Sequence, residues 1–252
     1  MAVHNVLVIG KDSRAVRALE RMLVHAGFHL KKKSPDVIFC LGGDGTYLYA
    51  ERCYPGISKL LIRNKSICSK CPPSHHLPDS AVILDKLKKG QYHIEKHTKL
   101  EARVGKKRLL CSNDFMIRNK NLTQALRFTM YINNTRMPPC IGDGIVVATP
   151  FGSTAYFYAI TKKHFTHGIG LAFNNGATPL RYKLLKDTDV VTIQIDREQA
   201  ELAGDNNPRT IILKPGAVIT IKKAPETAPF VTMRTNFVEK LFAGRRKSFI
   251  GL

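Results

Sequence analysis

The sequence predicts two domains, an open parallel α/β domain followed by a β-rich domain. In the N-terminal part, apolar runs alternate with segments of helical periodicity, a pattern typical of an open parallel sheet. After about residue 92, short segments rich in β-branched residues are separated by turn residues, which indicates consecutive β-strands. The chain has 252 residues, enough for one large or two modest domains.

The first elements follow from apolar runs that end at glycines. Residues 3–10 predict a strand, and residues 12–27 predict a helix capped by Asp12 or Ser13. A second strand over 36–41 runs into the glycine turn Gly42–Thr46, and a helix follows as far as Pro55. This turn lies at the carboxyl end of its strand, which is where open α/β sheets bind ligands.

The remaining elements set the expected domain boundaries. Residues 65–78 read as a loop, residues 79–90 as a helix, and residues 93–235 as a series of strands. The last residues, 236–252, are expected to form a short basic helix or arm that belongs to the first domain. The predicted domains are therefore 1–92 with about 236–252, and 93–235.

Charge is the strongest compositional signal, with 40 Lys and Arg against 19 Asp and Glu, a net charge of +21. Such a field attracts anionic partners, although the basic residues are scattered along the chain. No apolar run is long enough to span a bilayer, and no signal peptide is recognised, so a cytoplasmic protein with reduced cysteines is expected.

The turn Gly42-Gly43-Asp44-Gly45-Thr46 could bind a phosphate or only connect a strand to a helix. Glycines let a ligand approach the backbone, and the N–H groups at a helix start attract anions. Asp44 would repel a phosphate by itself, but it could face a metal ion or take a proton from an attacking hydroxyl. The alternative is that Asp44 simply caps the helix.

A second motif spans Gly142–Ala159, where a buried strand runs into a turn with Pro150 and Gly152. Ser153 and Thr154 place hydroxyl groups at the expected start of the next helix, which could form an anion or sugar site. The alternative is an ordinary helix N-cap.

Three ordered motifs together resemble the NAD kinase family: GGDGT at 42–46, Ser-Asn-Asp at 112–114 and DGIVVATPFGSTAY at 143–156. The resemblance implies a Rossmann-like α/β domain, a β-sandwich-like domain and a C-terminal arm that returns to the first domain. It also implies phosphoryl transfer from ATP, or from polyphosphate in some members, to the 2′-hydroxyl of the adenosine ribose of NAD. Mg²⁺ or another divalent cation would accompany the donor.

The resemblance assigns Asp44 as the base that activates the ribose hydroxyl. Asp114 stands where the family has Glu, and Asp143 would approach the nicotinamide end, often from a neighbouring subunit. Thr154, Ala155 and Tyr156 would line the adenine pocket. The full set implied to bind NAD or nucleotide is Gly43, Gly45, Thr46, Asn113, Asp114, Asp143, Ser153, Thr154, Ala155, Tyr156, Ala159 and Asn207.

The loop over 62–78 departs from the family, because its glycines and Leu-Gly-Phe are absent. It contains Cys68-x-x-Cys71 followed by His75, which are ligand types and spacings that zinc accepts. A single C-x-x-C is a weak zinc signal, so reduced cysteines are expected and structural zinc is disfavoured.

Two other functions stay open at this stage. One is a lipid or other small-molecule kinase that shares GGDGT, and the other is a non-catalytic NAD-binding or nucleic-acid-binding protein. The sequence has neither a G-x-x-x-x-G-K-[ST] phosphate loop nor a G-x-G-x-x-G dinucleotide motif. Neither a membrane nor a nucleic acid is expected as a partner, and the resemblance implies a homodimer or homotetramer.

Overall fold

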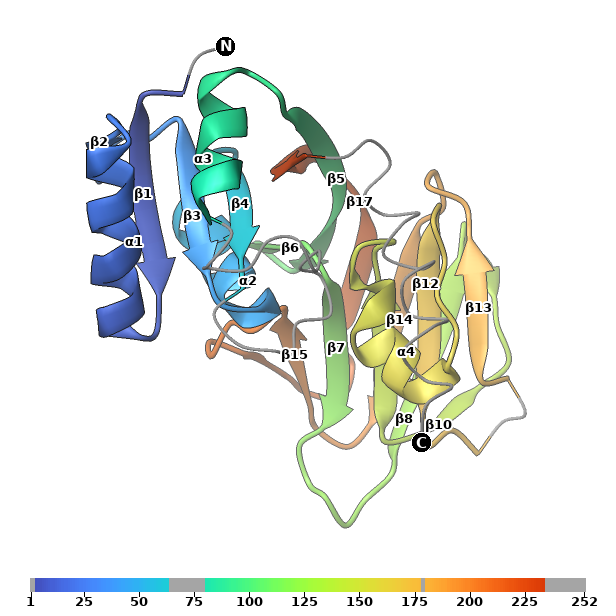
Figure 1. Ribbon diagram of the computed structural model, residues 1–252. Helices are drawn as coiled ribbons and strands as arrows, with labels where there is room; N and C mark the ends of the chain where they lie inside the picture. Colours follow the sequence, from blue (N-terminus) through green and yellow to red (C-terminus); the bar gives the residue numbers. More distant parts are fainter. Residues whose placement is uncertain (1–2, 64–79, 178–179, 234–252) are drawn as a thin grey trace, which may run out of the picture. The chain divides into compact units, whose positions relative to one another are not determined.

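The computed structural model describes residues 3–63, 80–177 and 180–233 (Figure 1). The zinc candidates Cys68, Cys71 and His75 and the arm over 236–252 lie outside these residues. The chain divides into two compact units, Met1–His97 with Thr227–Leu252, and Thr98–Glu226.

The first unit contains a parallel sheet with the strand order β2-β1-β3-β4. Its strands are β1 (Asn5–Gly10), β2 (His29–Leu30), β3 (Val37–Leu41) and β4 (Ser58–Ile62). The end of β17 (Val218–Thr232) continues this sheet, because Phe230 pairs in parallel with Lys59. Parallel strands joined by helices confirm the open α/β sheet predicted from the sequence.

The helices of this unit are α1 (Ser13–His25), α2 (Asp44–Cys53) and α3 (Ser80–Lys88). Asp12 caps α1, since its side chain accepts the N–H groups of Arg14 and Ala15. The predicted start of α2 was too late, because the helix already begins at Asp44 and includes Thr46. Figure 1 shows α1 lying along β1, and Leu19 and Leu23 are buried there with Val6.

The second unit contains two antiparallel sheets. One has the order β13 (Tyr182–Leu185), β12 (Ile169–Asn174), β11 (Gly144–Ala148), β7 (Asp114–Asn119), β15 (Ala200–Gly204) and β16 (Ile211–Leu213). The other contains β10 (Cys140–Gly142), β8 (Leu126–Ile132), β14 (Val191–Arg197) and the first part of β17, with β9 (Thr135–Arg136) beside β8. A hairpin joins β5 (His93–Val104) to β6 (Lys107–Cys111).

The core of the second unit lies between these two sheets. Phe115 and Ile145 come from one sheet, and Phe128 and Ile193 from the other, and all four belong to one buried cluster. Apolar side chains from facing sheets that share a core define a β-sandwich. The predicted β-sandwich-like domain is therefore confirmed.

The other face of strand β11 is also covered, which explains why every residue of this strand is buried. Val146 and Ala148 pack there with Phe157 of helix α4 (Tyr156–Thr161) and with Phe165. The rings of Phe157 and Phe165 meet edge to face, with centroids 5.0 Å apart. This packing fixes α4, and with it Tyr156, on the outer face of the sheet.

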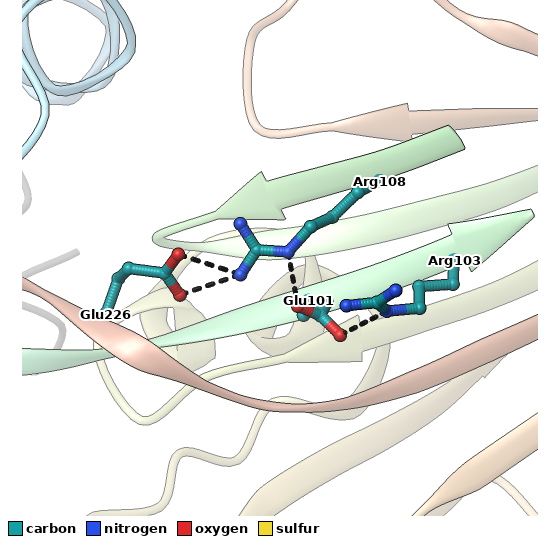
Figure 2. Close-up of polar contacts among 4 residues, drawn as sticks. All are labelled: Glu101, Arg103, Arg108 and Glu226. Atoms are coloured by element: carbon teal, nitrogen blue, oxygen red, sulfur yellow. Dashed lines mark hydrogen bonds and ion pairs between the residues drawn. The ribbon is translucent and has the colours of Figure 1, made fainter. Parts of the chain in front are cut away.

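A network of charges lies on the β5–β6 hairpin (Figure 2). The buried carboxylate of Glu101 accepts hydrogen bonds from Arg103, at 2.7 Å, and from Arg108. Arg108 also donates to both carboxylate oxygens of Glu226, at 2.8 Å. The two arginines lower the pKa of Glu101 to about 2, mainly through the hydrogen bond from Arg103.

Candidate functional site

The GGDGT turn lies at the carboxyl edge of the parallel sheet, between β3 and α2. Gly42 has φ +155, and a Cβ added there would lie 2.4 Å from the Thr46 hydroxyl oxygen, so this position requires glycine. Asp44 is half-buried and is the first residue of α2, while Gly45 is exposed. The turn therefore presents a carboxylate and an open backbone at a helix N-terminus, where anions are favoured.

In the second unit, the backbone of Ser112–Asp114 is held by the carboxylate of Asp205. One carboxylate oxygen, Oδ2, accepts the N–H of Ser112 at 2.8 Å. The other, Oδ1, accepts the N–H groups of Asn113 at 2.7 Å and Asp114 at 3.3 Å. The N–H of Asp205 in turn donates to the carbonyl of Asp114 at 2.9 Å. The segment that carries Asn113 and Asp114 is thus fixed to the turn after β15.

Thr149 holds the carbonyl side of the same segment. Its hydroxyl donates to the carbonyl oxygen of Ser112 at 2.7 Å, and its N–H donates to that of Asn113 at 2.8 Å. The same hydroxyl accepts the N–H of Gly152 at 2.9 Å. The Thr-Pro-Phe-Gly motif and the Ser-Asn-Asp motif therefore form one hydrogen-bonded assembly.

Gly152 lies directly against this assembly. A Cβ at residue 152 would lie 1.9 Å from the carbonyl oxygen of Asn113 and 2.6 Å from its Cα. Both neighbours are backbone atoms, so they cannot move aside as a flexible side chain could. Only glycine lets the two motifs approach this closely.

Ser153 and Thr154 lie in the short 3-10 helix η2 (Gly152–Thr154) and are buried. The N-cap interpretation is wrong, because the N-cap of α4 is Ala155 and no side-chain cap bond forms there. The Ser153 hydroxyl lies instead near two carbonyl oxygens, that of Pro150 at 2.7 Å and that of Phe165 at 3.2 Å. Ser153 therefore fixes the turn before α4.

Tyr156 and Ala159 lie on the outer face of α4 and line a cavity of about 430 Å³. Tyr156 is 52% exposed, so one face of its ring is available to a ligand. The other lining residues include Met116, Arg118, Asn174 and Asn175. This cavity combines apolar surface with a cation and two amides, which is a composition suited to a polar organic ligand.

Asp143 lies at the opposite end of the sheet from Asn113. Strands β7 and β11 are antiparallel, with Ala148 paired to Asp114 and Gly144 paired to Arg118. Five strand residues therefore separate Asp143 from the Asp114 end, a distance of about 17 Å at the usual rise per residue. The Asp143 carboxylate accepts a hydrogen bond from the Asn175 side chain at 2.6 Å, beside the cavity.

Asn207 lies in the turn that follows Asp205. Its N–H donates to the carbonyl of Gly204 at 3.1 Å, and its side-chain oxygen accepts the N–H of Arg209 at 3.1 Å. Asp205 joins this turn to Asn113, so the structure brings together two predicted binding residues that are far apart in the sequence. The sequence interpretation gave no role to Asp205, and it missed the contacts of both Asp205 and Thr149.

Comparisons with known proteins match the region that contains these two motifs. The sequence profile of the ATP-NAD kinase C-terminal domain matches residues 112–167, which include the Ser-Asn-Asp and Thr-Pro-Phe-Gly motifs. An NAD kinase from Thermoanaerobacter sp. (strain X514) is 28% identical over 228 residues, covering 83% of this chain and 80% of that relative. The chain is therefore similar to NAD kinases over most of its length.

Further comparisons show similarity over part of the chain and a shared fold. An NAD kinase from Helicobacter pylori (strain HPAG1) is 35% identical over 121 residues, which cover 46% of this chain and 41% of the relative. The crystal structure of yeast NADH kinase with NADH superposes with a TM-score of 0.84 at 16% identity, covering 99% of this chain and 90% of that chain. An NAD kinase from Archaeoglobus fulgidus, solved with ATP, gives a TM-score of 0.78 at 16% identity, covering 96% and 98%.

Two further findings concern the described residues only. Within residues 3–63, 80–177 and 180–233, no helix is long and apolar enough to cross a membrane. In the same ranges, no three His, Cys, Asp or Glu side chains come together in a way that could hold a metal ion.

Proposed function

We propose that this chain transfers a phosphoryl group from ATP or inorganic polyphosphate to the 2′-hydroxyl of the adenosine ribose of NAD, giving NADP. The observation that carries the proposal is the assembly of Ser112–Asp114, Thr149–Gly152 and Asp205 in the second unit. Two segments with family motifs and the Asp205 turn are joined there by hydrogen bonds, although they are widely separated in the sequence. Similarity to NAD kinases supports the same reaction.

In this proposal Asp44 is the general base. A ribose hydroxyl is a poor nucleophile at neutral pH, so a positioned carboxylate must take its proton as the phosphoryl group transfers. The half-buried carboxylate at the start of α2 suits this task, and the exposed Gly45 beside it leaves the backbone open to a phosphate. Gly43 and Thr46 complete the turn.

Asn113 and Asp114 are proposed to bind the ribose hydroxyls, for which an amide and a carboxylate are suitable partners. Thr154, Ala155, Tyr156 and Ala159 are proposed to surround the adenine, with Tyr156 offering a ring face. Ser153 is proposed to hold this segment in place through the contacts of its hydroxyl group with the carbonyl oxygens of Pro150 and Phe165. Asn207 is proposed to contact the ribose from the turn that Asp205 anchors.

A divalent cation is proposed to enter with the donor. Mg²⁺ commonly keeps several waters and binds through one or two carboxylates and the phosphates of the substrate, so it needs no cage made by the protein. The described residues fit this mode, because Asp44 provides a carboxylate at the turn. The cation would neutralise charge on the phosphates during the transfer.

Asp143 is proposed to approach the nicotinamide end of NAD that is bound to a neighbouring copy in a homodimer or homotetramer. The separation of Asp143 from Asn113 and Asp114 along β7 and β11 supports this proposal. Mixing the inactive variants Asp44→Asn and Asp143→Ala tests it. Activity that reappears on mixing supports a shared site, whereas a mixture as inactive as its components, or a monomer by light scattering, contradicts it.

The direct test of the reaction is to incubate the protein with NAD and Mg²⁺ and either ATP or polyphosphate, and to measure NADP. Asp44→Asn is expected to lower kcat by about 10²–10⁴-fold, while the Kd for NAD changes little, because a base acts mainly in the transition state. Asp85→Asn, on the exposed side of α3, serves as the matched control and should retain wild-type turnover. Folded wild-type protein that forms no NADP with either donor would refute the proposal.

A further inference from the structure

Asp205 combines a left-handed backbone with a carboxylate that serves three N–H groups. Its φ is +51, a region that residues other than glycine seldom adopt, although Asp and Asn do so more often than most. Such strain persists where the surroundings fix it and is frequent at functional sites. Here the surroundings are Ser112, Asn113 and Asp114, each of which donates its N–H to this carboxylate.

These hydrogen bonds hold the backbone of Asn113 and Asp114 from both sides. Their backbone N–H groups are held by Asp205, and the carbonyl oxygens of Ser112 and Asn113 are held by Thr149. With the backbone held from both sides, the Cα–Cβ bonds from which the two side chains project keep a fixed direction. A charged acceptor makes stronger hydrogen bonds than a neutral one, so the carboxylate is the dominant restraint.

Asp205 also controls the turn that carries Asn207. The N–H of Asp205 donates to the Asp114 carbonyl, and Asn207 closes the same turn onto Gly204. Asp205 therefore joins the turn that carries Asn207 to the segment that carries Asn113 and Asp114. These three side chains come from segments about 90 residues apart, as the separation of 92 between Asn113 and Asp205 shows.

We infer that Asp205 is a positioning residue for NAD binding. It fixes the position of the Asn113–Asp114 pair relative to Asn207. This inference rests on the proposed function. Asp205 would act without touching NAD, by fixing the backbone from which the binding side chains project. Because those side chains would hold the ribose in both the ground state and the transition state, losing Asp205 should weaken binding more than it slows the chemical step.

Two substitutions test the inference, because both Asn and Gly accept φ near +51 and preserve the course of the chain. Asp205→Asn keeps the shape but replaces one acceptor oxygen with an NH₂ group facing the N–H donors. Asp205→Gly removes the carboxylate entirely. We expect KM and Kd for NAD to rise about 10-fold or more in Asp205→Gly and less in Asp205→Asn, with kcat per folded molecule within a few-fold of wild type.

Asp189→Asn is the matched control. The Asp189 carboxylate also caps a turn of the second unit, since it accepts the N–H of Lys186 and the side-chain amide of Asn133, both at 2.8 Å. This substitution should lower the melting temperature without raising KM for NAD. A merely structural role of Asp205 would give the same result in its own variants, with lower stability and an unchanged KM.

The outcomes separate this inference from the proposed function. If the wild type forms NADP but both Asp205 variants keep the wild-type KM and Kd, the inference is overturned and the function stands. If the wild type forms no NADP, the proposed function fails, and the Kd for NAD from titration calorimetry still decides the role of Asp205. An unchanged Kd, or a wild type that does not bind NAD, overturns it. Loss of folding in Asp205→Gly leaves Asp205→Asn as the deciding variant.

Discussion

Lys59 and Glu51 form an ion pair in the interior of the first unit, with side-chain exposures of 0% and 2%. The Lys59 ammonium group also donates to the carbonyl of Tyr54, just after the end of α2. Lys59 lies on β4 and Glu51 on α2, so this pair ties the helix that begins with Asp44 to the sheet.

Lys59→Met should strongly destabilise the first unit. It leaves the Glu51 carboxylate buried beside an apolar side chain, and breaking a buried pair in this way costs about 3–5 kcal/mol. The double variant Glu51→Leu with Lys59→Met should recover most of that loss, because no charge then remains buried. Urea unfolding measures both effects.

Lys89→Met is the control for this prediction. Lys89 pairs with Asp85, but the two side chains are 58% and 56% exposed. Loss of an exposed pair should change the free energy of unfolding by less than about 1 kcal/mol. If Lys59→Met and Lys89→Met lower the free energy of unfolding equally, burial of the Lys59–Glu51 pair does not cause the predicted loss.

The Glu101 network should make stability depend on pH in acid. The pKa of Glu101 is lowered from 4.5 to about 2 in the folded protein, so its contribution is fully present above pH 4.5 and is lost as the pH falls towards 2. The contribution is expected to be about 1–2 kcal/mol, less than the full shift implies, because both arginines are partly solvated.

Comparison with Glu101→Gln isolates this effect from other acidic groups. The difference in unfolding free energy between wild type and variant should be constant above pH 5 and should shrink between pH 4.5 and 2. Unfolding titrations at several pH values measure it. A difference that stays constant down to pH 2, or that grows, would show that Glu101 is not the group responsible.

Gly152→Ala should disrupt the contact between the two motifs of the second unit. Its Cβ would lie 1.9 Å from the Asn113 carbonyl oxygen, so the backbone must shift and both stability and NAD affinity should fall. Gly105→Ala is the control, because Gly105 has φ +54 and open space around it. That change should cost only the backbone strain of about 1–2 kcal/mol and leave NAD affinity unchanged. Thermal unfolding and titration calorimetry distinguish the two.

Thr149→Val should lower the free energy of unfolding by about 1–3 kcal/mol, because it leaves the carbonyl of Ser112 and the N–H of Gly152 without their hydroxyl partner. Thr149→Ser keeps the hydroxyl and should retain most of the stability. If the serine variant is as unstable as the valine variant, the methyl group of Thr149 is responsible and the hydrogen bonds are not.

Local patterns in the sequence were sufficient for many of the elements, but the short strand β2 and the buried strand β4 were not predicted. The apolar runs at 3–10 and 36–41 and the Asp12 cap were correct, because strand burial and helix capping depend on neighbouring residues. The predicted start of α2 was too late because the glycines around Asp44 locally favour a turn, whereas Asp44 and Gly45 already belong to the helix. The zinc candidates and the C-terminal arm lie outside the described residues and stay predictions.

The sequence by itself determined the family motifs, the alternation of strands and helices, and the residue types available for phosphoryl transfer. Only the tertiary structure decided which of those residues are joined. Asp205 lies 93 residues from Ser112, and Gly152 meets the backbone of Asn113 through space, so no local pattern reports either contact. These contacts form between segments that the fold brings together. Periodicity and capping depend only on residues that are close in the sequence, so they cannot predict such contacts.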